Sequence, residues 1–142
     1  VDSERLGCYG HSMGSTHAYM VGPWEPRLNA TVCNCCLPTY AAIEEHEILH
    51  CFPNFVTGIY PEADTPDIVS LIAPRALHMN FGERDGGSPI EYVKKAMPVI
   101  RRAYESMHAE DNFSFFIEPA VGHVLSDAMW QRTKSFFAKH LG

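Results

Sequence analysis

The chain has 142 residues, of which 46% are hydrophobic and 20% are charged, an ordinary composition for one globular domain that excludes a disordered chain. Its formal net charge is −6 and lysine and arginine form no cluster, so neither nucleic acid nor an anionic membrane is an expected partner. No apolar run approaches the roughly eighteen residues that a membrane span needs, and nothing at the start resembles a signal peptide.

The first predicted elements are a strand, a helix and a second strand. Leu6 to Tyr9 is apolar or small on both faces, as expected inside a parallel sheet. Ser15 to Val21 favours a helix, which Gly22-Pro23 should end because it joins a stop signal to a helix breaker. Leu28 to Cys36 is a second short strand, closed by Leu37-Pro38.

The turn between the first strand and the first helix reads Gly-His-Ser-Met-Gly at residues 10–14. This is the G-x-S-x-G pattern of a nucleophile elbow, in the strand-turn-helix context that the motif requires. We predict strained backbone geometry at Ser12, and we expect Gly10 and Gly14 to be steric necessities because the strand and the helix pass close by. The alternative is a glycine-rich turn that contains an incidental serine.

The segment from Thr39 to Arg75 has a less regular pattern. A short helix is expected over Tyr40 to His50, and one or two helical turns over Asp67 to Ile72, with loops between them. A long excursion that carries aromatic residues in a compact α/β domain usually has a function. We expect this segment to form a wall over the site, with plain cover of the sheet as the alternative.

Strands and helices alternate again in the C-terminal half. Ala76 to Phe81 and Phe113 to Ile117 are predicted strands. Pro89 to His108 is a predicted amphipathic helix, which Pro98 should kink or split in two. A last helix is expected to begin with a cap at Asp127 and to run to about His140.

This alternation predicts one abbreviated α/β domain over residues 1–142, with roughly four parallel strands flanked by helices. Ligands of such sheets bind beyond the carboxyl ends of the strands. Ser12, Asp85 and His123 each directly follow a predicted strand. We therefore expect these three side chains to converge at one edge of the sheet.

These residue types have a shared chemistry. A serine hydroxyl is a poor nucleophile unless a base takes its proton and a buried acceptor holds that base in one tautomer. Of eight histidines, only His123 lies on a short loop after the last strand with glycine before it. Asp85 is the expected acid, and Glu83 in the same turn is the serious alternative; Asp64 and Asp67 fit helix capping better. The order serine, aspartate, histidine matches a known arrangement of this catalytic triad.

Other side chains are expected around the same site. The backbone N–H of Met13, the residue after the nucleophile, is the expected oxyanion donor. His11, Phe55 and Tyr60 are expected substrate contacts. The aromatic residues that could line an apolar pocket are Trp24, Phe52, Phe55, Tyr60 and Trp130, although aromatic side chains more often pack in a core. No metal and no organic cofactor is indicated.

Five cysteines make an odd number, and three of them are crowded together: Cys8, Cys33, Cys35, Cys36 and Cys51. The crowded group lacks the paired C-x-x-C spacing of a zinc site. Because it falls in a predicted strand, we expect buried, reduced thiols that act as small hydrophobic side chains. Reduced thiols favour a reducing compartment and hence a cytoplasmic protein.

With these motifs the sequence resembles the α/β-hydrolase superfamily. The stretch from Asp67 to Leu77, then Gly82 with Asp85, and Gly122-His123 are similar to the dienelactone hydrolase and acetyl xylan esterase branch. The resemblance spans Arg5 to Phe137. It implies hydrolysis of carboxylic esters of small acyl groups through a serine acyl-enzyme.

The resemblance also implies that a part of the fold is missing. Members of the family are about twice this length, and strands before the elbow carry the loop that supplies half of the oxyanion hole. The chain is then a naturally short form or a C-terminal piece, with Met13 as the one available donor. Loss of one donor costs roughly a hundredfold to a thousandfold in rate.

Two further expectations follow from the missing strands. Leu6 to Tyr9 would become an open sheet edge, so we expect the chain to associate, most simply as a homodimer. The alternative to an esterase is a non-catalytic binding or interaction module that keeps the triad without a complete oxyanion hole. A peptidase or lactonase on the same triad is a further possibility, since the pocket decides the chemistry.

Overall fold

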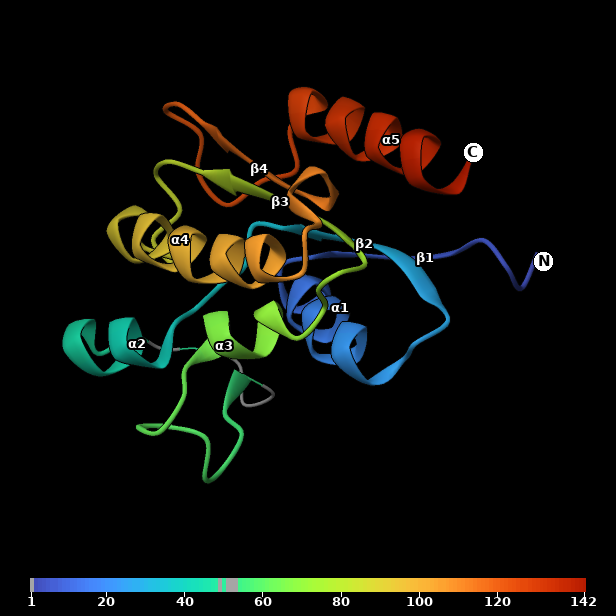
Figure 1. Cartoon of the computed structure of the whole chain (residues 1–142). Coiled ribbons are helices and arrows are strands. Elements are labelled where there is room, and N and C mark those ends of the chain that lie inside the picture. Colours follow the sequence, from blue (N-terminus) through green and yellow to red (C-terminus); the bar gives the residue numbers. More distant parts are fainter. Residues whose placement is uncertain (1, 49, 51–53) are drawn as a thin grey trace.

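The computed structural model describes residues 2–48, 50 and 54–142. Within them, four strands form one sheet: β1 (Leu6–His11), β2 (Leu28–Asn34), β3 (Ala76–Gly82) and β4 (Phe113–Glu118). The strands lie in the order β1-β2-β3-β4, and each is parallel to its neighbour (Figure 1). The expected α/β class with about four parallel strands is confirmed. The elbow strand β1 lies at an edge of this sheet.

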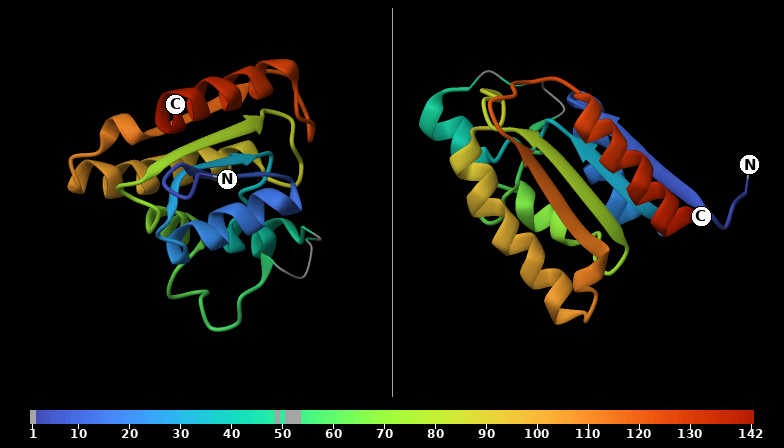
Figure 2. Two further views of the ribbon diagram at one scale, coloured as in Figure 1. Left: turned by 90° about the vertical axis from the view of Figure 1, so that its right-hand side faces the viewer. Right: turned by 90° about the horizontal axis from the view of Figure 1, so that it is seen from above.

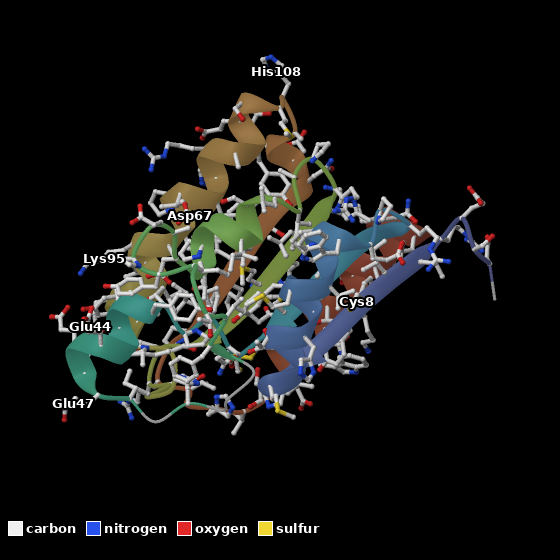
Figure 3. The ribbon with its side chains drawn as sticks, turned by 90° about the horizontal axis from the view of Figure 1, so that it is seen from below. Cys8, Glu44, Glu47, Asp67, Lys95 and His108 are labelled. Atoms are coloured by element: carbon white, nitrogen blue, oxygen red, sulfur yellow. The ribbon has the colours of Figure 1, made fainter. Side chains whose placement is uncertain are left out.

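Helices cover both faces of the sheet and make a three-layered fold. In the described part of the chain they are α1 (Met13–Trp24), α2 (Tyr40–His46), α3 (Thr65–Ser70), α4 (Ile90–Ser106) and α5 (Asp127–Leu141), with a 3₁₀ turn, η2, at Glu110–Asn112. Helices α1, α3 and α4 lie on one face of the sheet, and α5 lies on the other (Figure 2). Glu44 of α2, Glu47 directly after it and Lys95 of α4 are exposed and lie at the periphery (Figure 3).

Two cores stabilise these layers. The larger lies between the sheet and α1, α3 and α4, and its fully buried members include Tyr19, Leu37, Ile72, Leu77, Met79, Ile100 and Tyr104. The smaller lies beneath α5 and consists of Ala30, Val32, Ala76 and Phe136. Burial of apolar surface is the main force that holds such layers together. No helix among the described residues has both the length and the apolar character needed to cross a bilayer.

A buried polar ladder crosses the α5 face of the sheet. His78 Nδ1 contacts Ser114 Oγ at 2.8 Å, and His78 Nε2 contacts Asn80 Oδ1 at 2.9 Å. The Asn80 amide donates to Asn34 Oδ1 at 2.6 Å and to Thr133 Oγ1 of α5 at 3.4 Å. Burying a polar group is costly unless the group is hydrogen-bonded. These contacts therefore fix the register of β2, β3 and β4 and the position of α5 on the sheet.

Several helix boundaries differ from the sequence prediction. Helix α1 continues through Pro23 to Trp24, and α4 contains Pro98 without being split. In α4 the buried face formed by Tyr92, Ala96 and Ile100 is continuous across the proline, so packing holds both halves in one helix. Helix α2 ends at His46, before the predicted His50.

The starts of α3 and α5 also differ from the sequence prediction. Helix α5 is capped by Ser126, whose hydroxyl accepts from the Met129 N–H at 3.1 Å, so the cap expected at Asp127 lies one residue earlier. Helix α3 begins at Thr65, before the predicted Asp67. Asp64 and Asp67 form a capping box at its start, as their positions suggested.

Candidate active site

The site is built around the turn between β1 and α1. Ser12 has φ 57° and ψ −123°, a strained conformation for a residue with a side chain. Its N–H donates to the Asn34 carbonyl at 2.9 Å, and its own carbonyl accepts from the Ser15 N–H at 2.9 Å. The sheet on one side and the helix on the other therefore fix this backbone, as the elbow motif predicted.

Glycine is required on only one side of this turn. A Cβ atom on Gly10 would lie 1.9 Å from the Gly14 carbonyl oxygen, so no side chain fits there. A Cβ atom on Gly14 would meet nothing within 4 Å. The expectation that Gly14 is also a steric necessity is therefore wrong in this structure.

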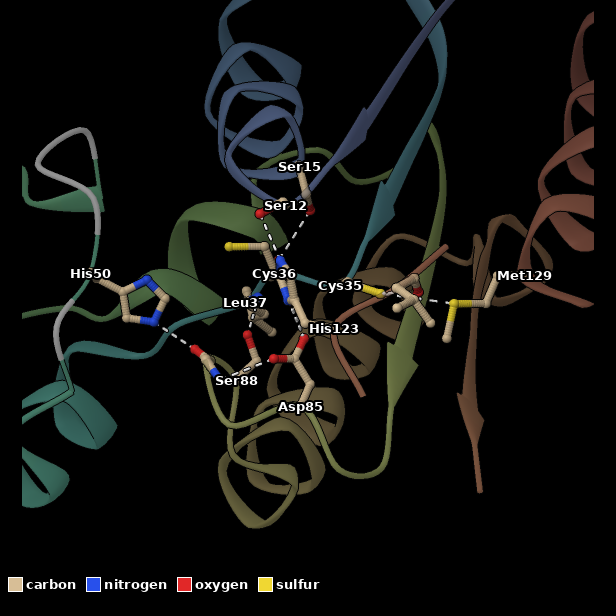
Figure 4. A network of polar contacts seen from close by, with 12 residues as sticks. Ser12, Ser15, Cys35, Cys36, Leu37, His50, Asp85, Ser88, His123 and Met129 are labelled. Atoms are coloured by element: carbon tan, nitrogen blue, oxygen red, sulfur yellow. Dashed lines mark hydrogen bonds and ion pairs between the residues drawn. The ribbon is translucent and has the colours of Figure 1, made fainter. Parts of the chain in front are cut away.

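The three expected side chains lie in hydrogen-bonding sequence (Figure 4). His123 Nε2 lies 2.7 Å from Ser12 Oγ, and His123 Nδ1 lies 2.8 Å from Asp85 Oδ2. Because a carboxylate can only accept, Nδ1 carries the proton, which leaves the Nε2 lone pair to accept from the serine hydroxyl. A proton on Ser12 can thus pass directly to His123. The catalytic roles of the three residues remain predictions.

The loop after β3 holds the acid, and a close backbone contact joins this loop to the one that carries His123. The Asp85 residue is only 3% exposed, and its Oδ1 accepts from the Gly87 N–H at 2.9 Å. A Cβ atom on Gly82 would lie 2.2 Å from the Gly122 carbonyl oxygen, so glycine allows the two loops to approach. Glu83 accepts instead from the Ala120 N–H at 2.9 Å. The structure therefore places Asp85, and not Glu83, against His123.

Met13 is the first residue of α1. The first N–H groups of a helix have no carbonyl partner within it, and they carry the positive end of the helix dipole. The Met13 N–H is thus a suitable donor to an oxyanion formed beside Ser12. Its role stays a prediction.

A cavity of about 340 Å³ adjoins the three side chains. Besides Ser12, Met13, Asp85 and His123, it is lined by Cys35, Cys36, His50, Asn54, Arg84, Gly86, Gly87 and Ser88. Burial raises the pKa of Cys35 to about 11, so this thiol stays protonated at neutral pH and does not compete with Ser12 as a nucleophile. The volume is at the lower end of the range for small-molecule pockets.

His11 lies beside the triad histidine. Its ring centroid is 5.5 Å from that of His123, and its Nδ1 is buried without a hydrogen-bond partner among the described residues. Burial, followed by the proximity of His123, lowers the pKa of His11 below the usual histidine range, while Asp85 acts in the opposite direction. A neutral His11 does not repel a His123 that becomes protonated.

The aromatic residues expected at the pocket lie elsewhere. Phe55 and Tyr60 line a separate cavity of about 330 Å³ with Tyr40 and Glu44, so the structure does not bring them to Ser12. Trp24 is 87% exposed, and Trp130 packs edge-on against Tyr9. Phe52 lies outside the described residues, as does Cys51.

Cys8, Cys33 and Cys35 are free thiols. Cys33, Cys35 and Cys36 are buried, and Cys8 is partly buried. Among the described residues, no group of three or more His, Cys, Asp or Glu side chains is placed to hold a metal ion.

The cavity-lining residues that sequence reasoning missed include His50 and Asn54. Both come from the irregular segment between β2 and β3, and both line the cavity at Ser12. Part of this segment therefore forms a wall of the cavity, as expected. The pattern gave no signal that singled out these two residues, because their contacts depend on how the segment folds back.

Comparisons with known proteins show the same fold. No protein-family model matches the chain. The Bacillus subtilis (strain 168) protein named "Putative hydrolase YtaP" is 24% identical over 148 residues, which cover 99% of this chain and 48% of that protein. Two solved structures are a glucuronoyl esterase of carbohydrate esterase family 15 from Caldicellulosiruptor kristjansonii, with a TM-score of 0.80 at 15% identity, and a glucuronoyl esterase catalytic domain from Hypocrea jecorina, with a TM-score of 0.81 at 17% identity.

A third structure, TT1662 from Thermus thermophilus, has a TM-score of 0.72 at 18% identity. The chain aligns over 96% to 99% of its own length with these three structures but covers only 44% to 55% of theirs. It thus spans about half the length of the proteins that it matches. The four-stranded sheet, the strained serine turn and these likenesses together show that the chain has a partial α/β-hydrolase fold.

Proposed function

We propose that the chain carries the catalytic machinery of a serine carboxylic ester hydrolase that acts on small acyl groups. One observation carries the proposal: Ser12, His123 and Asp85 are hydrogen-bonded in sequence, at 2.7 Å and 2.8 Å, with the serine on a strained turn. This is the arrangement that activates a serine hydroxyl. The names of the fold neighbours, glucuronoyl esterases and a methylesterase, support ester rather than peptide substrates.

The proposed reaction uses each side chain in turn. Ser12 Oγ attacks the ester carbonyl carbon while His123 Nε2 takes the hydroxyl proton, and Asp85 stabilises the imidazolium that forms. The tetrahedral oxyanion accepts from the Met13 N–H. His123 then gives its proton to the departing alcohol, which leaves an acyl-enzyme on Ser12. Water, deprotonated by His123, hydrolyses the acyl-enzyme and regenerates the serine.

Turnover of nitrophenyl esters tests this proposal. We expect cleavage of the acetyl and butyryl esters, and weaker cleavage as the acyl chain outgrows a cavity of about 340 Å³. Ser12→Ala should abolish turnover while the melting temperature is retained. Ser106→Ala, which removes an exposed serine at the end of α4, is the matched control and should behave as the wild type. Equal activity of Ser12→Ala and the wild type would remove Ser12 from its proposed role.

A second candidate is a non-catalytic binding module. The observation behind it is that Met13 is the one oxyanion donor identified among the described residues, where two donors are usual in this mechanism. This candidate predicts a folded protein in which the triad geometry persists but no acyl-enzyme forms. A well-folded wild type without turnover would favour it.

A further inference from the structure

A chain of hydrogen bonds joins the helix behind Ser12 to the loop that carries the acid. Thr16 Oγ1, on α1, donates to Asn54 Oδ1 at 2.6 Å. The Asn54 side-chain nitrogen lies 3.0 Å from His50 Nδ1. His50 Nε2 lies 2.5 Å from the Gly87 carbonyl oxygen, a contact visible in Figure 4. The chain thus runs from α1 through the irregular segment to the loop after β3.

The same series of hydrogen bonds continues from Gly87 to the side chains of Asp85, His123 and Ser12. The Gly87 N–H donates to Asp85 Oδ1, and the other oxygen of Asp85 accepts from His123, which in turn accepts from Ser12. Ser12 and Thr16 both belong to the first turn region of α1, so the contacts form a ring that begins and ends at one helix. Every residue of the ring except Thr16 lines the cavity at Ser12.

The hydrogen-bond partners of His50 fix the tautomer of its imidazole. A carbonyl oxygen only accepts, so His50 Nε2 carries a proton and donates it to Gly87. Nδ1 of the neutral ring is then an acceptor, and it meets the amide of Asn54, which donates. Both nitrogens of His50 are therefore used by the protein. This histidine holds its neighbours and does not shuttle a proton to substrate.

The two ends of this series of hydrogen bonds, Thr16 and Gly87, differ in rigidity. Thr16 and Asn54 are 0% and 2% exposed, so that end is fixed in the interior. The other end is the Gly86-Gly87 pair, and glycine restricts the backbone least of all residues. A hydrogen bond from a fixed side chain to Gly87 therefore limits the movement of the loop whose N–H orients the carboxylate of Asp85.

We propose that His50 is a positioning residue that holds the residue 86–88 loop and, through Gly87, keeps the carboxylate of Asp85 aligned on His123. The inference rests on the proposed esterase function. Without the His50 N–H the loop can shift, the Asp85 to His123 hydrogen bond loses its alignment, and proton transfer from Ser12 slows. The lost N–H donates to the Gly87 carbonyl, so its removal should affect kcat more than KM.

Three variants separate the hydrogen bond from packing. His50→Phe keeps the ring volume and removes both nitrogens, His50→Ala removes the whole ring, and His50→Gln retains an N–H able to reach the Gly87 carbonyl. His17→Ala, at an exposed position on α1, is the control. For hydrolysis of a nitrophenyl ester we expect kcat to fall about tenfold in His50→Phe and His50→Ala, with a smaller change in KM. His50→Gln should recover most of the loss.

A second measurement does not depend on turnover. The Nδ1 proton of His123 should give a far-downfield proton NMR resonance through its hydrogen bond to Asp85, and we expect it to move upfield or broaden in His50→Phe but not in His50→Gln. An unchanged resonance together with unchanged kcat in a folded His50→Phe would overturn the inference. An inactive wild type would instead overturn the proposed function, and the resonance would still decide the role of His50.

Discussion

Asp85→Asn replaces one of the two carboxylate oxygens by an NH₂ group, although each oxygen of the buried Asp85 accepts a hydrogen bond. Asp85 Oδ1 accepts from the Gly87 N–H at 2.9 Å, and Oδ2 accepts from His123 Nδ1 at 2.8 Å. An asparagine offers one carbonyl oxygen and one NH₂ group, so it can satisfy only one of these donors. If the oxygen stays with Gly87, the NH₂ group faces His123 and forces its Nδ1 to become an acceptor.

The consequence for Ser12 follows from the tautomer. With Nδ1 as the acceptor, His123 Nε2 carries the proton and points an N–H at Ser12 Oγ, where a lone pair is needed. We expect kcat to fall by about 10⁴-fold, which corresponds to roughly 5 kcal/mol of transition-state free energy. The melting temperature should change little, because the new side chain has the same shape.

The assay is hydrolysis of a nitrophenyl ester, with Glu83→Gln as the matched control. Glu83 contacts the Ala120 N–H at the rim of the same turn, so its replacement should leave kcat within about twofold of the wild type. Asp85→Asn that kept more than a tenth of the wild-type kcat would refute the reasoning. An equal loss in both variants would show that the turn as a whole, rather than the Asp85 carboxylate, supports the activity.

Three further predictions concern stability and association. Gly10→Ala should prevent folding or lower the free energy of unfolding by more than about 3 kcal/mol, because its Cβ atom would lie 1.9 Å from the Gly14 carbonyl oxygen. Gly14→Ala, within α1, should leave that free energy unchanged or raise it by up to about 1 kcal/mol. Urea unfolding measures both. Burial, and then the charge of Arg132, lowers the pKa of His78 below its usual value of 6.5, so near that pH the unfolded chain binds more protons than the folded one. The contribution of His78 to stability is therefore complete above about pH 6.5 and is lost as the pH drops below it. The free energy of unfolding of His78→Gln should depend less on pH in this range. The position of β1 at the sheet edge predicts a dimer at micromolar concentration, which sedimentation would contradict by showing a stable monomer.

The fold could be predicted from the sequence where local patterns were strong. The four strands were found because short apolar runs between turn residues leave few alternatives, and their parallel order follows from the intervening helices. Helix ends were found less well. Pro98 lies inside α4, because the packing of a continuous apolar face outweighs the loss of one backbone hydrogen bond, and Pro23 lies one residue before the end of α1.

The candidate site likewise contains residues that the sequence pattern predicted and residues that it did not. Ser12, Asp85 and His123 could be named because each follows a strand, and the topology of a parallel sheet brings such positions together. The polar ladder through Asn34, His78 and Asn80 could not, because it depends on cross-strand register. His50 was equally hidden, since its partners are Asn54, whose position depends on a contact with α1, and Gly87 in the loop after β3.

Aromatic residues gave the weakest guidance. Phe55 and Tyr60 were expected at the substrate, yet they gather with Tyr40 around another cavity. An aromatic side chain in a long segment signals burial somewhere, and sequence spacing does not say against which wall. The choice between the two cavities is made by where the segment folds back.

Labelling with a fluorophosphonate probe tests the central claim most directly, because only a serine with an activating base reacts quickly. We predict that mass spectrometry of the labelled protein finds one modified residue, Ser12, and that His123→Ala reduces the labelling rate by at least about a hundredfold. Folded wild-type protein that is not labelled at Ser12, or that is labelled equally fast without His123, would contradict the account.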